Sequence, residues 1–200
     1  LTAADGLVDA ARSLAGRMDI VSVERIRDEL FRLLEVEDPS RGFDLLDAMG
    51  LLPAVLPDLV GFSVDERVRV VDLLKQAPND PMFRLVVLAH SAGGSRAFPG
   101  WASSLRLSGR DADRAQTLLE GSDRISALGG EPTDADVRRL ASFCGERLDD
   151  VLAFAELVGG LTTSLAKGVE RLRASGELDN LGPALDGDTV MEILGVGPGP

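Results

Sequence analysis

Apolar side chains recur every three or four residues along nearly the whole chain, and this helical period constrains the fold more than any other feature. A typical segment is Val23 to Val36, in which Ile26, Leu30 and Leu33 fall on one face of a helix. No run alternates apolar and polar residues with the period of two that marks a half-buried strand. The sequence therefore predicts an all-α fold, an irregular array of about ten short helices with no sheet.

Capping residues and helix stops divide this pattern into segments. Side chains that can cap a helix precede the expected starts, at Ser22, Ser40, Ser63, Thr133 and Asp188. Proline or glycine marks the expected stops, at Asp38-Pro39, Gly50, Gly129 to Pro132, Gly145 and Ser175-Gly176. The almost wholly apolar segment Met82 to His90 predicts a central, buried helix. We expect Leu51 to Leu59 to be a tight connector and Ser91 to Gly100, rich in Ser and Gly, to be a loop.

The charge of the chain is unevenly distributed. The net charge is −12, with 21 Lys and Arg against 33 Asp and Glu. Residues 1–60 carry 6 basic and 12 acidic side chains, residues 61–130 carry 9 and 8, and residues 131–200 carry 6 and 13. A polyanion is therefore expected to favour the middle third. There Arg106, Arg110 and Arg114 recur every four residues, so we expect them to line one helix stripe that contacts RNA phosphates.

Composition excludes several kinds of protein. One Cys rules out an intramolecular disulfide, and one His rules out a His-rich metal cluster. The lack of Tyr rules out a catalytic tyrosine acid or nucleophile. No apolar run approaches the ~20 residues of a membrane span, and no signal peptide is visible, so we expect a cytoplasmic protein without a membrane partner.

The few residues that could carry chemistry have simpler structural interpretations. His90 ends an apolar segment as in phosphohydrolases with a His-Asp doublet, but Ser91 stands where the Asp would be, so we favour a helix-end histidine. Asp186 and Asp188 could be a metal-binding carboxylate pair, although Asp188 is better explained as a helix cap. Cys144 is expected in the core, and Trp101 either anchors packing or stacks on a base. We assign no catalytic residue and no metal ligand.

The chain ends in a Gly- and Pro-rich segment. Leu194 to Pro200 has the pattern of a helical hairpin whose next helix start offers backbone N–H groups to phosphate. Gly195 and Gly197 are therefore candidate RNA contacts. The second helix of that hairpin would lie beyond Pro200, so the sequence reads as truncated there. The alternative is an ordinary Gly/Pro terminus.

Several segments resemble one family in the order of their residues as well as in composition. Val21 to Leu30 (VSVERIRDEL), followed by Met49-Gly50-Leu51-Leu52 and Leu56-Pro57-Asp58-Leu59, is similar to the RNA-binding region of bacterial tRNA nucleotidyltransferases. These are the CCA-adding enzymes and their poly(A) polymerase relatives. Leu105 to Ser108 resembles the body of that family, and Leu185 to Pro200 its tail.

The resemblance implies the helical neck, body and tail of the family. Residues 1–60 would be neck-like RNA-binding helices, 61–130 the body and 131–200 the tail. The spacing of Arg25 and Glu29 matches the motif that braces the family's nucleotide-binding helices; a surface ion pair between residues i and i+4 is the simpler reading, and both can hold.

The expected function follows from the same resemblance. The chain would bind tRNA and position its acceptor and T arms, while a catalytic head of the parent chain, absent here, uses Mg²⁺ with CTP or ATP. No cofactor is expected in these 200 residues themselves. The alternative is a degenerate His-Asp-type helical domain with a regulatory or protein-interaction role, supported by the Leu85 to His90 segment alone.

Overall fold

The computed structural model describes residues 6–160 and 162–178, and within these ranges all regular structure is helical. The α-helices are α1 (Leu7–Leu14), α2 (Val23–Leu34), α3 (Ser40–Ala48), α4 (Leu52–Val55), α5 (Val64–Gln76), α6 (Pro81–Ser91), α7 (Gly94–Ser104), α8 (Gly109–Ser126), α9 (Asp134–Cys144), α10 (Leu148–Leu157) and α11 (Thr163–Ala174). Short 3-10 helices are η1 (Ala15–Ile20), η2 (Pro57–Leu59) and η3 (Gly145–Arg147). The expected all-α class is confirmed.

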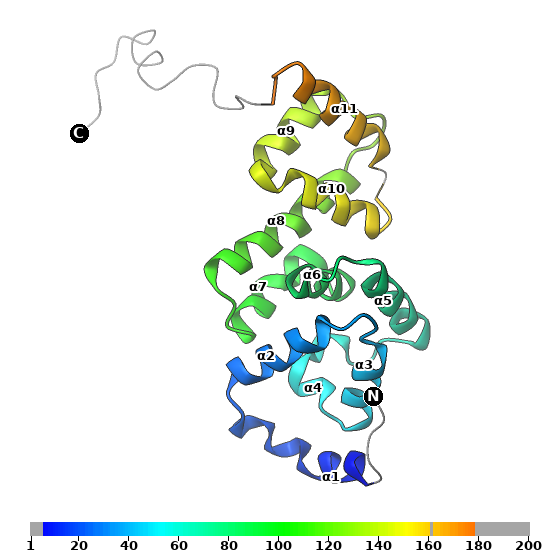
Figure 1. Ribbon diagram of the computed structural model, residues 1–200, viewed down its shortest axis with the longest axis vertical. Helices are drawn as coiled ribbons and strands as arrows, with labels where there is room; N and C mark the ends of the chain where they lie inside the picture. The colour runs from blue at the N-terminus through cyan, green and yellow to red at the C-terminus, as the bar shows by residue number, and fades with distance from the viewer. Residues whose placement is uncertain (1–5, 161, 179–200) are drawn as a thin grey trace, which may run out of the picture.

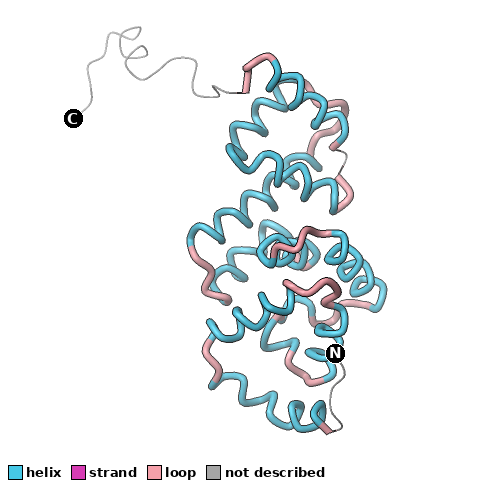
Figure 2. The backbone as a smooth tube through the Cα atoms, in the orientation of Figure 1, coloured by secondary structure: helices cyan, strands magenta, loops and turns pink. Residues whose placement is uncertain are grey.

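The helices form an elongated array that follows the order of the chain (Figures 1 and 2). Helices α1 to α4 make one end, α5 to α8 the middle, and α9 to α11 the other end. Helix α8 packs against α6 and α7 on one side and against α9 and α10 on the other, so it joins the middle to the far end. The proposed division at residues 60 and 130 remains an interpretation of the sequence. No helix in the described part of the chain is long and apolar enough to cross a membrane.

Helix α6 is the centre of the core, as its apolar sequence predicts. Leu85, Val86, Val87 and Leu88 are completely buried. The carboxylate of Asp80 accepts hydrogen bonds from the N–H groups of Met82 and Phe83, which caps the helix start. This cap and the apolar sequence together explain why a short helix is stable at the middle of the array.

Two capping boxes confirm the helix starts expected at Ser63 and Thr133. Ser63 and Glu66 bond reciprocally at the start of α5, and Thr133 and Asp136 do so at the start of α9. Ser22 precedes α2 but its side chain makes no capping bond. At α3 the expected Ser40 cap is wrong, since Ser40 is already helical and donates its N–H to Asp38 Oδ1 at 3.0 Å.

The expected loop at Ser91 to Gly100 is wrong, because most of it belongs to α7. Phe98 and Trp101 are 1% and 4% exposed, so apolar burial stabilises this helix. Pro99 cannot donate to the carbonyl of Ser95, but Gln116 Nε2 of α8 donates to that oxygen at 3.2 Å instead. The connector expected at Leu51 to Leu59 contains α4 and η2, and the helices α1 and η1 were not predicted from the sequence.

Two glycines allow neighbouring helices to approach closely. A Cβ atom on Gly121 of α8 would lie 2.5 Å from Val151 Cγ1 of α10. A Cβ atom on Gly42 of α3 would lie 2.0 Å from Leu33 Cδ1 of α2. Both distances are far below van der Waals contact, so a side chain at either position would displace its neighbour: the flexible end of Leu33 can move, whereas the stiff, β-branched Val151 requires glycine at position 121.

Candidate functional site

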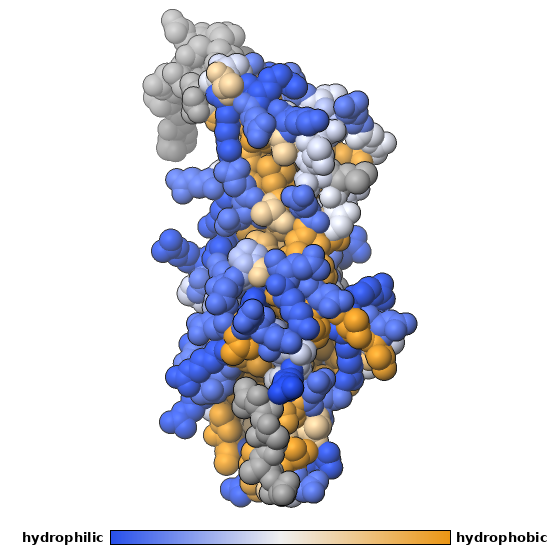
Figure 3. Space-filling view, turned by 45° about the vertical axis from the view of Figure 1, so that its right-hand side comes forward, coloured by the Kyte–Doolittle hydropathy of each residue, from blue (hydrophilic) through white to orange (hydrophobic). Residues whose placement is uncertain are grey.

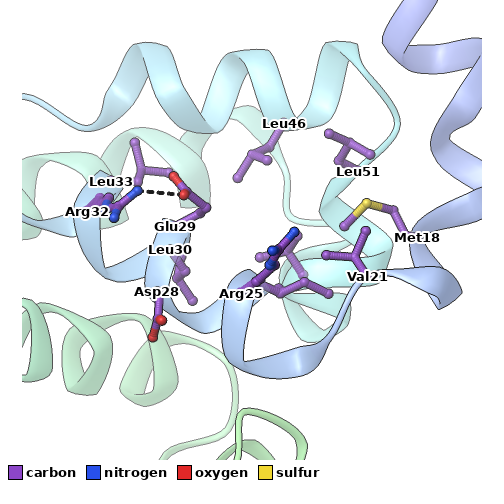
Figure 4. Close-up of a pocket in the computed structure, with 12 residues that line it drawn as sticks. Met18, Val21, Arg25, Asp28, Glu29, Leu30, Arg32, Leu33, Leu46 and Leu51 are labelled. Atoms are coloured by element: carbon purple, nitrogen blue, oxygen red, sulfur yellow. Dashed lines mark hydrogen bonds and ion pairs between the residues drawn. The ribbon is translucent and has the colours of Figure 1, made fainter.

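A groove of about 530 Å³ runs along α2 at the end of the array that contains α1 (Figure 4). Its floor is apolar and comes from η1, α2, α3 and α4 with the residue before it, and its rim carries the charged side chains of α2. The residues that line it are Met18, Val21, Arg25, Ile26, Asp28, Glu29, Leu30, Arg32, Leu33, Leu46, Leu51 and Val55. An apolar floor with a charged rim can hold a ligand or a polypeptide segment that has both apolar and polar groups.

Arg25 and Glu29 both line this groove but do not pair with each other. Glu29 Oε1 instead accepts from Arg32 Nη1 at 2.7 Å, one turn further along α2 (Figure 4). The ion pair expected between residues 25 and 29 is therefore wrong. Arg25 is exposed and has no described carboxylate as a partner, so its charge is available to a ligand at the rim.

Helix α1 lies against this end of the array with little burial of its own. None of its residues is buried, and Arg12 of α1 donates from Nε (3.0 Å) and Nη2 (2.6 Å) to the carbonyl oxygen of Ala48 in α3. Leu7, Leu14 and Ile20 are 49%, 54% and 71% exposed. Figure 3 shows the resulting hydrophobic surface at this end of the molecule. Three large apolar side chains of α1 and η1 are therefore exposed at this end of the described chain.

Three arginines at this end form no ion pair with any described carboxylate. They are Arg17, Arg25 and Arg41, and all three are exposed. The other three basic residues of residues 6–60 pair with nearby acids, since Arg12, Arg27 and Arg32 contact Asp9, Asp28 and Glu29. Neither Arg17 nor Arg41 was predicted from the sequence to be a site residue. The sequence contained a signal for Arg17, because no acidic residue lies three or four positions from it. It contained no such signal for Arg41, which has acidic residues at both spacings.

The three arginines expected on one helix stripe are in three different environments. Arg106 precedes α8 in a left-handed conformation (φ 47°), so it lies outside the helix and the stripe geometry is wrong for it. Its Nη1 contacts Glu24 Oε1 of α2 at 2.6 Å. Arg110 lies in the first turn of α8, exposed and without a described carboxylate partner.

Arg114 has the most acidic surroundings of the three. Its Nη2 atom lies 2.8 Å from Asp80 Oδ2 and 3.4 Å from Asp150 Oδ2, so it links α8 to the start of α6 and to α10. Burial lowers the pKa of this guanidinium, but its hydrogen bond to Asp80 and the charges of Asp80 and Asp150 raise the pKa overall. Whether these three residues touch RNA is still a prediction.

The remaining candidates lie in the core or, for the half-buried His90, against it. The ring of His90 packs edge-on against Phe154 at 5.7 Å between centroids, which confirms the helix-end histidine. Burial raises the pKa of the Cys144 thiol to about 11, as expected for a core cysteine. Trp101 is buried and anchors packing rather than offering a face to a base.

Some predicted residues lie outside the described ranges. They are Asp186, Asp188, Gly195 and Gly197. Among residues 6–160 and 162–178, no three His, Cys, Asp or Glu side chains come together as metal ligands would. We therefore assign no metal ligand there.

Comparisons with known proteins locate this end of the array in a family. Residues 5–63 match the family described as "Probable RNA and SrmB-binding site of polymerase A". The chain is also 30% identical over 239 residues to an A-adding tRNA nucleotidyltransferase of Deinococcus radiodurans. That similarity covers 96% of this chain and 54% of the relative, so the chain spans about half of the relative's length. No solved structure matches the chain significantly.

These similarities and the all-helical fold identify the chain as a helical region of the CCA-adding enzyme and poly(A) polymerase family. The matched segment contains α1 to α4, the groove, and the exposed Arg17, Arg25 and Arg41. It lies in the first third of the chain and not in the middle third, where charge alone had favoured a polyanion.

Proposed function

We propose that this chain is the tRNA-binding part of a nucleotidyltransferase, and that it positions the acceptor and T arms for nucleotide addition by a catalytic head of the same parent chain. The observation that carries the proposal is that three exposed arginines, Arg17, Arg25 and Arg41, have no described carboxylate partner and lie in the segment that matches the RNA-binding family. A guanidinium without a carboxylate partner can bind a phosphate without first breaking an ion pair.

The groove beside α2 has a second proposed role. Its apolar floor and the neighbouring exposed Leu7, Leu14 and Ile20 leave a surface that a further domain can cover. We propose that the head packs on this apolar surface and that Arg25 and Glu29 lie at the rim where head and RNA meet, so that they support the head's nucleotide-binding helices while Arg25 still reaches phosphate. Mg²⁺ and CTP or ATP would be bound by that head, and no step of the transfer is assigned to residues of this chain.

Further RNA contacts are proposed in the middle of the array. Arg110 is the best candidate because it is exposed and has no described carboxylate partner. Arg106 and Arg114 can reach phosphate only by exchanging Glu24 or Asp80 for it. Gly195 and Gly197 remain proposed contacts from the sequence.

The test is tRNA binding by the full chain with Arg17, Arg25 and Arg41 replaced together by Gln. Each lost phosphate contact lowers the magnitude of the log–log salt slope by about one, so the triple variant should lose about three. Arg69→Gln on α5 is the control, because Arg69 is likewise exposed without a described carboxylate partner but lies outside the family-matched segment and outside the arginines assigned to RNA. If the triple variant kept the affinity and slope of the unchanged chain, the proposed surface would be wrong.

A further inference from the structure

A second cavity lies between the last turn of α8 and one face of α9, away from the family-matched segment. Its volume is about 210 Å³. Ile125, Leu128 and Leu140 form its apolar walls. Arg124, Asp136 and Arg139 supply its polar groups, and both arginines are exposed. Residues 136, 139, 140 and 143 follow the helical spacing of one face of α9, so this face forms one side of the cavity.

Arg124 gives the cavity a flat, positively charged wall. Its Cζ atom lies 4.0 Å from the centroid of the Phe143 ring, in a cation–π contact that holds the guanidinium against the aromatic face. Arg124 also lines the cavity and forms no ion pair with a described carboxylate. An arginine plane supported on one side by a ring is a stacking surface for another flat group.

Asp136 and Arg139 of α9 add an acceptor and a donor to the lining of the cavity. Arg139 Nη2 donates to Asp136 Oδ1 at 2.5 Å, and Asp136 Oδ2 accepts from the N–H and hydroxyl of Thr133. This one bond leaves the remaining N–H groups of Arg139 available. Hydrogen bonds from Thr133, first of all, hold the pKa of Asp136 at about 2, so its carboxylate is ionised at neutral pH.

We propose that this cavity binds an unpaired nucleobase of RNA, stacked on Arg124 and hydrogen-bonded by Arg139. The inference rests on the proposed RNA-binding function and adds to it a base contact at the α8–α9 junction. A phosphate alone would not need apolar walls, and an aromatic side chain would have no ring acceptors for Arg139. A base uses the flat cation, the apolar walls and the donor together.

The test measures binding of the full chain to two fluorescent RNA probes, a short unpaired oligonucleotide and a blunt-ended duplex of equal length. Arg124→Lys keeps the charge but removes the plane. It should lower affinity for the oligonucleotide about five- to tenfold, since stacking on one base contributes about that much. The same variant should bind the duplex as the unchanged chain does and keep its salt slope, because no phosphate charge is lost.

Further variants separate stacking from loss of structure. Phe143→Leu keeps an apolar side chain beneath Arg124 and should also weaken oligonucleotide binding selectively. Arg139→Gln should do so as well, through the lost donor. Arg69→Lys on α5 is the matched control and should change neither affinity. Unchanged thermal unfolding of Arg124→Lys would show that the fold is retained.

The outcomes distinguish the two proposals. Equal losses for the oligonucleotide and the duplex would mean that Arg124 contacts phosphate, which overturns the base site. Unchanged affinity of all three variants for an oligonucleotide that the chain does bind would also overturn the base site alone. A chain that binds neither probe nor tRNA would overturn the proposed function as well.

Discussion

The Nη1 atom of Arg84 lies 2.7 Å from the carbonyl oxygen of Leu34, although 50 residues separate the two along the chain. The same Nη1 lies 2.5 Å from the carbonyl oxygen of Val36. Arg84 belongs to the central helix α6 and is only 3% exposed. The last carbonyls of a helix lack partners within it and carry partial negative charge, so a buried guanidinium stabilises them. This contact fixes α2, the helix that forms the groove rim, to the core.

Replacing Arg84 with Met should destabilise the protein. Two carbonyl groups at the end of α2 would lose their donor while staying largely shielded from water, and we expect a loss of about 2–3 kcal/mol in the free energy of unfolding. Urea unfolding measures it. Arg84→Lys should lose less, because one ammonium can still reach a carbonyl. Arg69→Met, on the exposed face of α5, should stay close to the unchanged chain. An unfolding midpoint of Arg84→Met equal to that control would show that the contact adds nothing.

The contact of Arg84 with Leu34 joins residues far apart in the chain, and contacts of this kind could not be predicted from the sequence. The helix starts at Ser63 and Thr133 were predictable from the sequence, and so was the apolar helix α6, because capping and periodicity depend on residues only a few positions apart. Helix α7 was not, since its stability depends on burial of Phe98 and on a bond from Gln116 that lies 21 residues beyond Ser95.

In the candidate site, too, the segment was predictable from the sequence but the pairing of its side chains was not. The sequence located the segment around Arg25 and Glu29 through its resemblance to a family, and the comparisons confirmed that family. The sequence could not show that Glu29 would pair with Arg32, because Arg25 and Arg32 both lie at helical spacing from Glu29. Nor could it show that Arg106 would meet Glu24, which lies 82 residues earlier.

Gly121→Ala should be destabilising although alanine is the better helix former. The new Cβ atom would lie 2.5 Å from Val151 Cγ1, so α8 and α10 would have to separate. Overpacking of this kind costs about 1–3 kcal/mol. Gly100→Ala in α7 is the matched control, since nothing lies within 4 Å of its Cβ position, and it should be neutral or slightly stabilising.

A double variant tests the cause of the Gly121 effect. Val151→Ala removes the methyl groups that the new Cβ would meet. The loss in Gly121→Ala with Val151→Ala should therefore be smaller than the sum of the two single losses. Additive losses, measured by thermal unfolding, would mean that the helix crossing does not limit this position.

His90 should make stability depend on pH just below neutrality. Burial, opposed by the charge of Asp123, lowers the pKa of His90 from 6.5. A histidine with a lowered folded pKa binds fewer protons when folded than when unfolded. Stability is therefore complete above pH 6.5 and falls as the pH drops from there toward the folded pKa.

The comparison of urea midpoints at about pH 7.5 and about pH 5.5 isolates this effect, because carboxylates titrate well below that window. His90→Gln should show a smaller drop than the unchanged chain. An identical drop in both proteins would assign the pH dependence to other groups.

Arg110 and Arg114 should separate RNA binding from stability. Arg110 is exposed without a described carboxylate partner, so Arg110→Ala should weaken binding of different tRNAs equally and lower the salt slope by about one. Arg114 is held by Asp80 and Asp150. Arg114→Ala should mainly lower the unfolding temperature, because two carboxylates lose their shared cation. Filter binding across a range of salt concentrations and thermal unfolding measure the two effects. An unchanged salt slope in Arg110→Ala would show that this side chain faces solvent in the complex, and a slope changed only in Arg114→Ala would mean that RNA displaces its carboxylates.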